Sequence, residues 1–226
     1  MEYTASLVQL NIDERISARR KDALSRGIPV ADDETLQFLL LTLAAVKPTR
    51  ILEIGTAVGL STVAMLYECQ NARVTTMELE EERYLEAKQN FADFDVSDRV
   101  TAHLGDAGEI LAMMDGGFDF VFLDGPKAQY EKYLFDLKRL MKKGAVLFAD
   151  DVLLYGWVSG EEPTPQKRHS IVDKIRSYLD TVTKDRDFIT SVLNVGDGVA
   201  LSVYRGEQES ERKRLKDEGR AFSACG

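Results

Sequence analysis

The spacing at which hydrophobic residues recur changes along this chain, and these changes predict its secondary structure. Short apolar runs, typical of buried strands, alternate with longer stretches in which apolar residues recur every three or four positions, as in amphipathic helices. Five strands joined by helices predict a parallel sheet that is covered by helices. The predicted strands are residues 50–55, 73–79, 99–105, 118–124 and 145–151, and the helices are residues 59–70, 80–94, a short segment ending at Met114, and 127–142.

The two ends of the chain depart from this alternation. Residues 2–25 predict a first helix, which Gly27 and Pro29 end. Residues 33–46 predict a second helix, capped by Asp32 or Asp33.

Beyond the fifth strand, a loop over residues 156–165 leads to a helix over residues 166–183. Two β-rich runs then flank the sequence GDG, which predicts a hairpin and an antiparallel edge. We expect one domain over residues 1–205, with a helical appendage at residues 1–28. The charged segment 206–226 is expected to be a frayed helix or a flexible tail.

Composition narrows the possible partners of the protein. Its 29 basic and 38 acidic residues give a net charge of −9, which argues against broad binding to nucleic acid or to anionic membranes, although a local basic patch stays open. Cys69 and Cys225 lie too far apart in the sequence for a Cys-x-x-Cys motif, so a reducing cytoplasm is expected. The longest apolar run, residues 36–46, is shorter than the roughly 20 residues that a bilayer requires. We also expect no signal peptide.

The sequence RILEIGTAVGLS, residues 50–61, joins a predicted strand to a predicted helix through a glycine turn. Such a junction gathers backbone N–H groups and the positive end of a helix dipole, as nucleotide sites do. The dehydrogenase fingerprint G-x-G-x-x-G is not met, because Ala57 stands at its second glycine. Glu53 would also repel a diphosphate, whereas a carboxylate suits a ligand with an amino group.

Glu78 ends the next predicted strand, where nucleotide-binding α/β proteins place an acid that binds the ribose hydroxyls. An amino group, a ribose and no phosphate together describe S-adenosylmethionine. The alternative is that the glycine turn is only a structural feature of a doubly wound sheet.

Three carboxylates fall at the ends of predicted strands: Asp124 on one strand, and Asp150 and Asp151 on the next. The carboxyl ends of parallel strands face one crevice, where these groups would repel each other unless a cation lay among them. Oxygen ligands select a hard ion, Mg²⁺ first, with Mn²⁺ or Ca²⁺ as alternatives. The competing interpretation is that Asp124 only caps a helix and that the other two side chains point apart.

Lys127 follows Asp124 by three residues, in the first turn of a predicted helix. A metal ion nearby would disfavour the charged form of the lysine, which makes Lys127 a candidate general base. Without the aspartates it would be interpreted as a surface lysine.

From about Pro29 to Arg205 the chain resembles the cation-dependent O-methyltransferases, the group of catechol O-methyltransferase. Its bacterial tRNA 5-hydroxyuridine methyltransferase branch is the most similar, because a basic segment opens the late helix in QKRHSIVDKI and VGDG forms the hairpin. The resemblance implies a Rossmann-like class I methyltransferase fold, in which a seven-stranded, mostly parallel sheet with an antiparallel last strand has helices on both faces. It also implies a homodimer. It rests on LEIGTAVGLS, MELEEERYLEAKQNF, GDAGEIL, FDFVFLDGPKAQY, AVLFADDVLLYG and VGDGVALS.

The resemblance also implies a role for each matching residue. The methionine end of the cofactor would contact Glu53, Gly55, Thr56 and Ser61, and the ribose would contact Glu78. The adenine would lie beside Asp106 and Ala107, and Val30 and Ala31 would cover the cofactor. The metal would be bound by Asp124, Asp150 and Asp151, of which Asp124 also borders the cofactor, and Lys127 would be the base.

Two positions depart from the family pattern. The family has Asp-Asn where this chain has Asp150 and Asp151, and the added carboxylate would bind the metal more tightly or raise a neighbouring pKa. The family has Asp-Ala-x-Lys where this chain has Asp-Gly-Pro-Lys, and Pro126 is compatible with the first turn of a helix.

Three functions stay open from the sequence. The first is O-methylation of 5-hydroxyuridine at the tRNA wobble position, the second is O-methylation of small catechol-like phenols, and the third is a non-catalytic cofactor-binding protein. Tyr155 and Trp157 could stack on a flat substrate ring. Basic residues that could contact tRNA phosphates are Arg19, Arg20, Lys21, Lys167 and Arg168.

Overall fold

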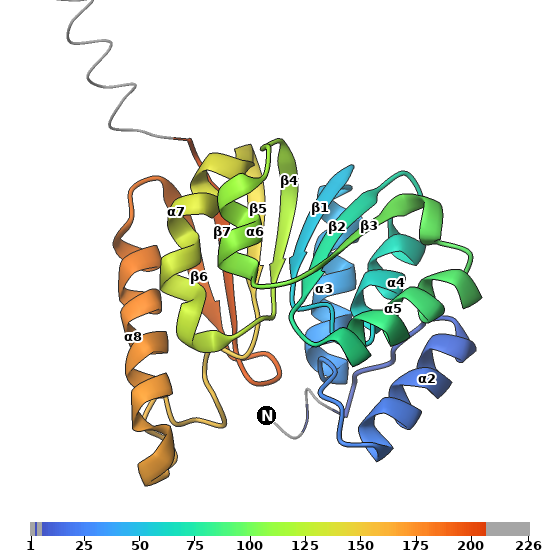
Figure 1. The fold of residues 1–226 in the computed structure, drawn as a ribbon. Helices are drawn as coiled ribbons and strands as arrows, with labels where there is room; N and C mark the ends of the chain where they lie inside the picture. The colour runs from blue at the N-terminus through green and yellow to red at the C-terminus, as the bar shows by residue number, and fades with distance from the viewer. Residues whose placement is uncertain (1–2, 4–5, 207–226) are drawn as a thin grey trace, which may run out of the picture.

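The computed structural model describes residue 3 and residues 6–206, so the predicted tail lies almost entirely outside the described residues. Seven strands form one sheet in these residues, in the order β3-β2-β1-β4-β5-β7-β6 (Figure 1). The strands are β1 (Arg50–Ile54), β2 (Arg73–Glu78), β3 (Val100–Leu104), β4 (Phe118–Leu123), β5 (Met141–Ala149), β6 (Phe188–Leu193) and β7 (Val199–Tyr204).

Strand direction follows the sequence prediction. Strands β1 to β5 pair in parallel, whereas β7 lies antiparallel to both β5 and β6. The predicted mostly parallel sheet with an antiparallel last strand is therefore confirmed.

Helices cover both faces of the sheet (Figure 1). Alternate strand residues face opposite ways, so Ile51 packs with one layer of helices while Leu52 packs with the other. Because both faces are covered, the central strands β1, β4 and β5 are mostly apolar, as in other parallel sheets. The first layer contains α2 (Glu14–Ser25), α3 (Asp33–Val46), α4 (Leu60–Glu68) and α5 (Glu81–Asp93), and the second contains α6 (Ala107–Met113), α7 (Tyr130–Leu140) and α8 (His169–Lys184).

The first predicted helix, residues 2–25, is wrong in its start, because α2 begins at Glu14. Asp13 caps this helix by accepting a hydrogen bond from the backbone N–H of Arg15. Residues 8–13 have no regular secondary structure, and Leu10 and Ile12 in this segment pack, partly buried, against the first helical layer. Burial of these two side chains against the layer thus replaces the predicted helical turns.

The boundary between the fourth crossover helix and the fifth strand also differs from its prediction. The helix was expected over residues 127–142, but α7 ends at Leu140 and β5 already begins at Met141. Met141 pairs with Phe118 of the neighbouring strand β4, so residues 141 and 142 belong to β5 and do not extend the helix. Residues 127–129 and 166–168, predicted as helix starts, form single 3₁₀ turns before α7 and α8.

The direction of the crossovers reverses between β1 and β4. The chain moves outward from β1 to β3 and then returns to place β4 on the other side of β1. In open α/β sheets this reversal leaves a crevice at the carboxyl ends of the strands, and ligands bind there. Among the described residues, no helix has the length and apolar character needed to cross a membrane.

Candidate active site

A pocket of about 630 Å³ lies at the carboxyl ends of β1, β2, β4 and β5, where the crossovers reverse. The glycine turn after β1 forms its floor, and the segment before α3 forms one wall. Of the site residues predicted from the sequence, those that line it are Val30, Ala31, Gly55, Glu78, Asp106, Ala107, Asp124, Lys127, Asp150, Asp151 and Tyr155.

The turn after β1 can be built only with glycine at its first position. Gly55 has φ +100°, and a Cβ atom there would lie 2.8 Å from the carbonyl carbon of Asp124. The backbone of β1 and the backbone after β4 thus approach each other without a side chain between them. Ala57, with φ +45°, follows in the turn and also lines the pocket, although the sequence analysis used it only to exclude a dinucleotide.

Glu78 lies at the end of β2 with its carboxylate held by backbone donors. One oxygen accepts hydrogen bonds from the N–H groups of Leu79 and Glu80, both at 2.9 Å, and the other accepts from Ala57 at 2.8 Å. These bonds fix the carboxylate between the glycine turn and the pocket. The oxygen that accepts from Ala57 keeps acceptor capacity, so Glu78 can still receive a hydroxyl donor from a ligand.

Asp106 caps α6, because its carboxylate accepts hydrogen bonds from the N–H groups of Gly108 and Glu109. Asp106 and Ala107 therefore bring the start of α6 to the pocket on the side of β3. On the opposite wall, Val30 and Ala31 belong to the extended segment that leads into α3. Both pairs line the pocket, whereas the adenine contact of Asp106 and Ala107 and the covering role of Val30 and Ala31 stay predictions.

Glu53 on β1, Thr56 in the glycine turn and Ser61 on α4 are not among the residues that line the pocket. The carboxylate of Glu53 is fully buried and accepts hydrogen bonds from the hydroxyl groups of Ser61, Thr62 and Thr76. Burial raises the pKa of Glu53 to about 7, against the opposing effect of these three donors. Glu53 thus supports the turn from below, and its direct contact with a cofactor stays a prediction.

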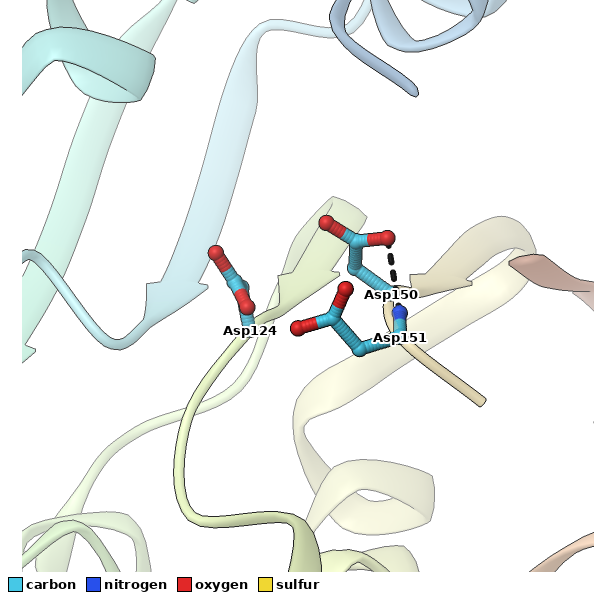
Figure 2. Close-up of side chains that lie close together, drawn as sticks. All are labelled: Asp124, Asp150 and Asp151. Carbon is cyan, nitrogen blue, oxygen red and sulfur yellow. Dashed lines mark hydrogen bonds between the residues drawn. The ribbon is translucent and has the colours of Figure 1, made fainter. Parts of the chain in front are cut away.

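Asp124, Asp150 and Asp151 converge at the ends of β4 and β5 (Figure 2). One oxygen of each carboxylate can be chosen such that all three lie within 4.8 Å of one another. Asp151 turns the backbone into the left-handed region, with φ +55°, and its N–H donates to the Asp150 carboxylate at 2.7 Å. The alternative that these side chains point apart is therefore wrong.

The three carboxylates fit a hard divalent cation on two grounds. Their donor atoms are all oxygen, which suits Mg²⁺, Mn²⁺ or Ca²⁺. Their electrostatics also favour added positive charge. Burial and then the charges of Asp124 and Asp151 raise the pKa of Asp150 well above its usual value, and burial raises that of Asp124 despite its lysine neighbour.

Lys127 joins this cluster from the 3₁₀ turn before α7. Its Nζ lies 2.7 Å from a carboxylate oxygen of Asp124 and 2.9 Å from one of Asp151. Burial would lower the pKa of Lys127, but the surrounding charges, that of Asp124 first, raise it well above its ordinary value. Without a cation the carboxylates therefore outweigh burial and stabilise the ammonium, and the easier loss of the Lys127 proton beside a bound metal ion stays a prediction. Pro126 does not prevent the predicted placement of Lys127.

The predicted substrate contacts separate into two groups. The side chain of Tyr155 is 70% exposed and lines the pocket, and its ring centroid lies 5.1 Å from that of Trp157, which packs partly buried against the core. Lys167 and Arg168 are exposed on the 3₁₀ turn before α8 and are not among the lining residues.

Asp197 is a pocket residue that the sequence analysis did not single out. It lies in the β6–β7 hairpin, and its carboxylate accepts a hydrogen bond from the backbone N–H of Tyr155. The motif VGDG was used only as a hairpin signal. An acid between two glycines in a turn at this end of the sheet could have indicated a role at the site.

A doubly wound sheet with a glycine turn, an acid after the second strand and a carboxylate cluster at the switch point defines a Rossmann-like α/β protein with a nucleotide-type pocket. Residues 9–205 match the model of a family described as O-methyltransferase. The chain therefore belongs to the O-methyltransferase family, and the predicted enzyme class is confirmed.

Individual relatives agree with this assignment. The chain is 35% identical to a catechol O-methyltransferase of Mycobacterium tuberculosis over 127 residues, which are 55% of this chain and 58% of that protein. It is 28% identical to a caffeoyl-CoA O-methyltransferase of Populus kitakamiensis, over 88% of this chain and 87% of the relative. The O-methyltransferase TomG from Streptomyces achromogenes, solved in complex with SAM, superposes with a TM-score of 0.77 at 26% identity, over 90% of this chain and 95% of TomG.

Proposed function

We propose that this protein transfers the methyl group of S-adenosylmethionine to one of two adjacent oxygens of a small, catechol-like acceptor, with the help of a divalent cation. The observation that carries the proposal is the position of the three-carboxylate cluster with Lys127, which lines the same pocket as the glycine turn and Glu78. A methyl donor and a metal-bound acceptor can therefore meet in one cavity. TomG, with bound SAM, and the catechol O-methyltransferase relative support the two ligand classes.

Each part of the pocket has a role in this proposal. The glycine turn and Glu78 would hold the donor, with Glu78 on its ribose hydroxyls. Asp124, Asp150 and Asp151 would hold the cation, which when bound lowers the pKa of an acceptor hydroxyl. With a cation neutralising its carboxylate partners, Lys127 would first lose its own proton to solvent, and the neutral amine would then receive the hydroxyl proton at Nζ. The acceptor oxygen forms a bond to the methyl carbon as the sulfonium–carbon bond breaks, which leaves a neutral thioether. Orientation of the two reactants supplies much of the acceleration.

Charge distribution favours a small acceptor over tRNA. Arg20 is buried and donates to the carbonyl of Ala31 at 2.8 Å and to Asp33 at 2.7 Å, so it is engaged within the protein. Arg19 pairs with Asp93 at 2.7 Å. Among the charged residues that line the pocket, acids outnumber bases, and the predicted phosphate contacts Lys167 and Arg168 lie outside its lining. A 5-hydroxyuridine would offer the same pair of adjacent oxygens, so tRNA is the alternative acceptor.

Methyl transfer should be assayed with S-adenosylmethionine on a panel of catechols and, separately, on a tRNA transcript that carries 5-hydroxyuridine. Turnover of catechols should disappear in EDTA and return with Mg²⁺, and Lys127→Ala should reduce kcat about 100-fold or more, as loss of a general base does. Lys138→Ala is the matched control, because Lys138 also pairs with two aspartates, Asp185 and Asp187, but does not line the pocket.

Full activity in EDTA would overturn the metal requirement, and an unchanged kcat in Lys127→Ala would remove Lys127 as the base. Methylation of the transcript without methylation of any catechol would identify tRNA as the acceptor instead.

A further inference from the structure

Tyr130, the first residue of α7, lies directly beneath the three-carboxylate cluster without contributing a ligand to it. Its side chain is fully buried, and its ring lies 5.5 Å from Nζ of Lys127. The edge of this ring packs against a second buried tyrosine, Tyr178 of α8, with ring centroids 5.4 Å apart at 79°. The Tyr130 hydroxyl is therefore fixed in position from two sides.

That hydroxyl connects the ends of the two strands that carry the cluster. It donates to the carbonyl oxygen of Leu123, the last residue of β4, at 2.9 Å, and it also lies in hydrogen-bond contact with the carbonyl oxygen of Asp150, after β5, at 3.2 Å. The parallel ladder between these strands reaches this same point, where the Asp150 N–H donates to the Leu123 carbonyl at 3.0 Å. Tyr130 thus adds one cross-strand connection immediately beyond the end of the ladder.

The connection falls on the peptide that orients both aspartates of β5. The Asp150 carbonyl belongs to the peptide unit that leads into Asp151, where the backbone turns to φ +55°. A non-glycine residue rarely adopts this left-handed conformation and must be held there by its surroundings. The Asp151 N–H of the same peptide donates to the Asp150 carboxylate. The orientation of this one peptide therefore sets the positions of both carboxylates relative to Asp124.

We propose that Tyr130 is a positioning residue that fixes the spacing between Asp124 and the Asp150–Asp151 pair and thereby sets the affinity of the site for a divalent cation. The inference rests on the proposed metal-dependent function. Groups that orient metal ligands commonly change metal affinity about 10- to 100-fold when they are removed. Tyr130 acts on two ligand-bearing strands through backbone carbonyls, so an effect at the lower end of that range is expected.

The test compares two tyrosine-to-phenylalanine variants. Tyr130→Phe removes the bridging hydroxyl but keeps the ring, whereas Tyr178→Phe removes a buried hydroxyl that has no hydrogen-bond partner within the described part of the chain. Titration of the full-length protein with Mn²⁺ alone, followed by calorimetry or by electron paramagnetic resonance of free Mn²⁺, should give a Kd about 10-fold higher for Tyr130→Phe. The Kd should stay within about twofold of wild type for Tyr178→Phe, because no bond is lost.

Two further readouts separate positioning from a general loss of structure. The Kd for S-adenosylmethionine should be unchanged in both variants. The glycine turn follows β1 and Glu78 ends β2, whereas the Tyr130 hydroxyl contacts the ends of β4 and β5. Amide hydrogen exchange at Asp150 and Asp151 should be faster in Tyr130→Phe and unchanged in Tyr178→Phe. This measurement needs only the folded protein, and it reports on the peptide even if metal binding is altered for another reason.

An unchanged Mn²⁺ affinity together with unchanged exchange in Tyr130→Phe would overturn the inference while leaving the proposed function intact. Equal losses in both variants would also overturn it, since they would indicate a packing effect of the tyrosine pair. If the wild-type protein did not bind Mn²⁺ at all, the metal requirement of the proposed function would fail, and the inference with it.

Discussion

At the scale of single residues, the site depends on positions where the backbone leaves no room for a side chain. Gly55 allows the turn after β1 to touch the backbone that carries Asp124. Gly144 provides a matched comparison, because its φ of +88° is close to the +100° of Gly55, yet a Cβ atom there would meet nothing within 4 Å.

Gly144→Ala should therefore cost only the strain of a left-handed alanine, roughly 1–2 kcal/mol in the free energy of unfolding. Gly55→Ala should cost a further 1–3 kcal/mol or so, because the added methyl group overlaps the Asp124 backbone and displaces it. Gly55→Ala should also weaken binding of S-adenosylmethionine. Urea denaturation and calorimetry check both effects, and equal destabilisation by the two variants would contradict the close approach as its cause.

At the scale of elements, the β6–β7 hairpin holds the loop that follows β5. The N–H groups of Val152 and Leu153 donate to the carbonyls of Gly198 and Asp197, both at 2.9 Å, and the Asp197 carboxylate accepts from the N–H of Tyr155. Leu154 and Tyr155 both have positive φ values, +47° and +56°. These hydrogen bonds therefore hold a strained loop, and they place the exposed ring of Tyr155 at the pocket.

Asp197→Ala should loosen Tyr155 and raise the KM for a catechol acceptor about fivefold, the equivalent of one hydrogen bond. The Kd for S-adenosylmethionine should not change, because this ligand is expected to bind at the glycine turn and Glu78 and not at Tyr155. Asp197→Asn keeps an oxygen that accepts from the Tyr155 N–H, so its KM should lie near the wild-type value. Steady-state kinetics of both variants check this, and an Asn variant as impaired as the Ala variant would assign the effect to charge instead.

At the scale of the whole molecule, buried carboxyl groups make stability depend on pH. Burial raises the pKa of Glu53 from 4.5 to about 7, so the folded protein holds this proton more tightly than the unfolded chain does. The sign follows from linkage: the stabilising effect of the proton is complete below the unfolded value of about 4.5 and is lost as pH rises toward 7. The shift corresponds to about 3 kcal/mol, at about 1.4 kcal/mol per unit.

Glu53→Gln removes this titration while keeping a group that can hydrogen-bond with Ser61, Thr62 and Thr76. In the metal-free protein, the free energy of unfolding of Glu53→Gln relative to wild type should therefore increase by about 3 kcal/mol between pH 4.5 and pH 8. Urea denaturation in EDTA at several pH values measures this difference. A difference that stays constant across the range would show that Glu53 does not carry the raised pKa.

Much of the fold was predictable because local patterns agreed with the tertiary structure. The helix over residues 33–46 has the predicted bounds, since Asp32 caps it and Lys47 ends it in a left-handed conformation just before Pro48. The first helix and the start of β5 were not predictable from periodicity. Leu10 and Ile12 are partly buried by contact with helices far along the chain, and Met141 joins the sheet by pairing with Phe118.

The residues of the candidate site also fall into two groups, those that the sequence could indicate and those that it could not. Residues directly after strands, such as Glu78 and Asp124, could be assigned from the sequence, because parallel strands end at one edge of the sheet. The VGDG turn could have indicated Asp197, but not its bond to Tyr155, and nothing in the sequence indicated that the Tyr130 hydroxyl meets the Asp150 carbonyl, because both contacts join segments far apart in the chain. Burial of Glu53 beneath the turn was also hidden, because two of its three hydroxyl partners come from α4 and the third from β2.

The sequence by itself determined the succession of strands and helices along the chain, because the spacing of hydrophobic residues is a local property. It also determined the positions of the glycine turn and of the acids at the strand ends, since these follow from single residues. Only the tertiary structure decided how the charges are balanced. Lys127 holds its proton because Asp124 and Asp151, carried by different strands, lie within 3 Å of its Nζ. Charges interact through space with an energy that depends on distance and burial, and neither quantity is fixed until the strands have paired.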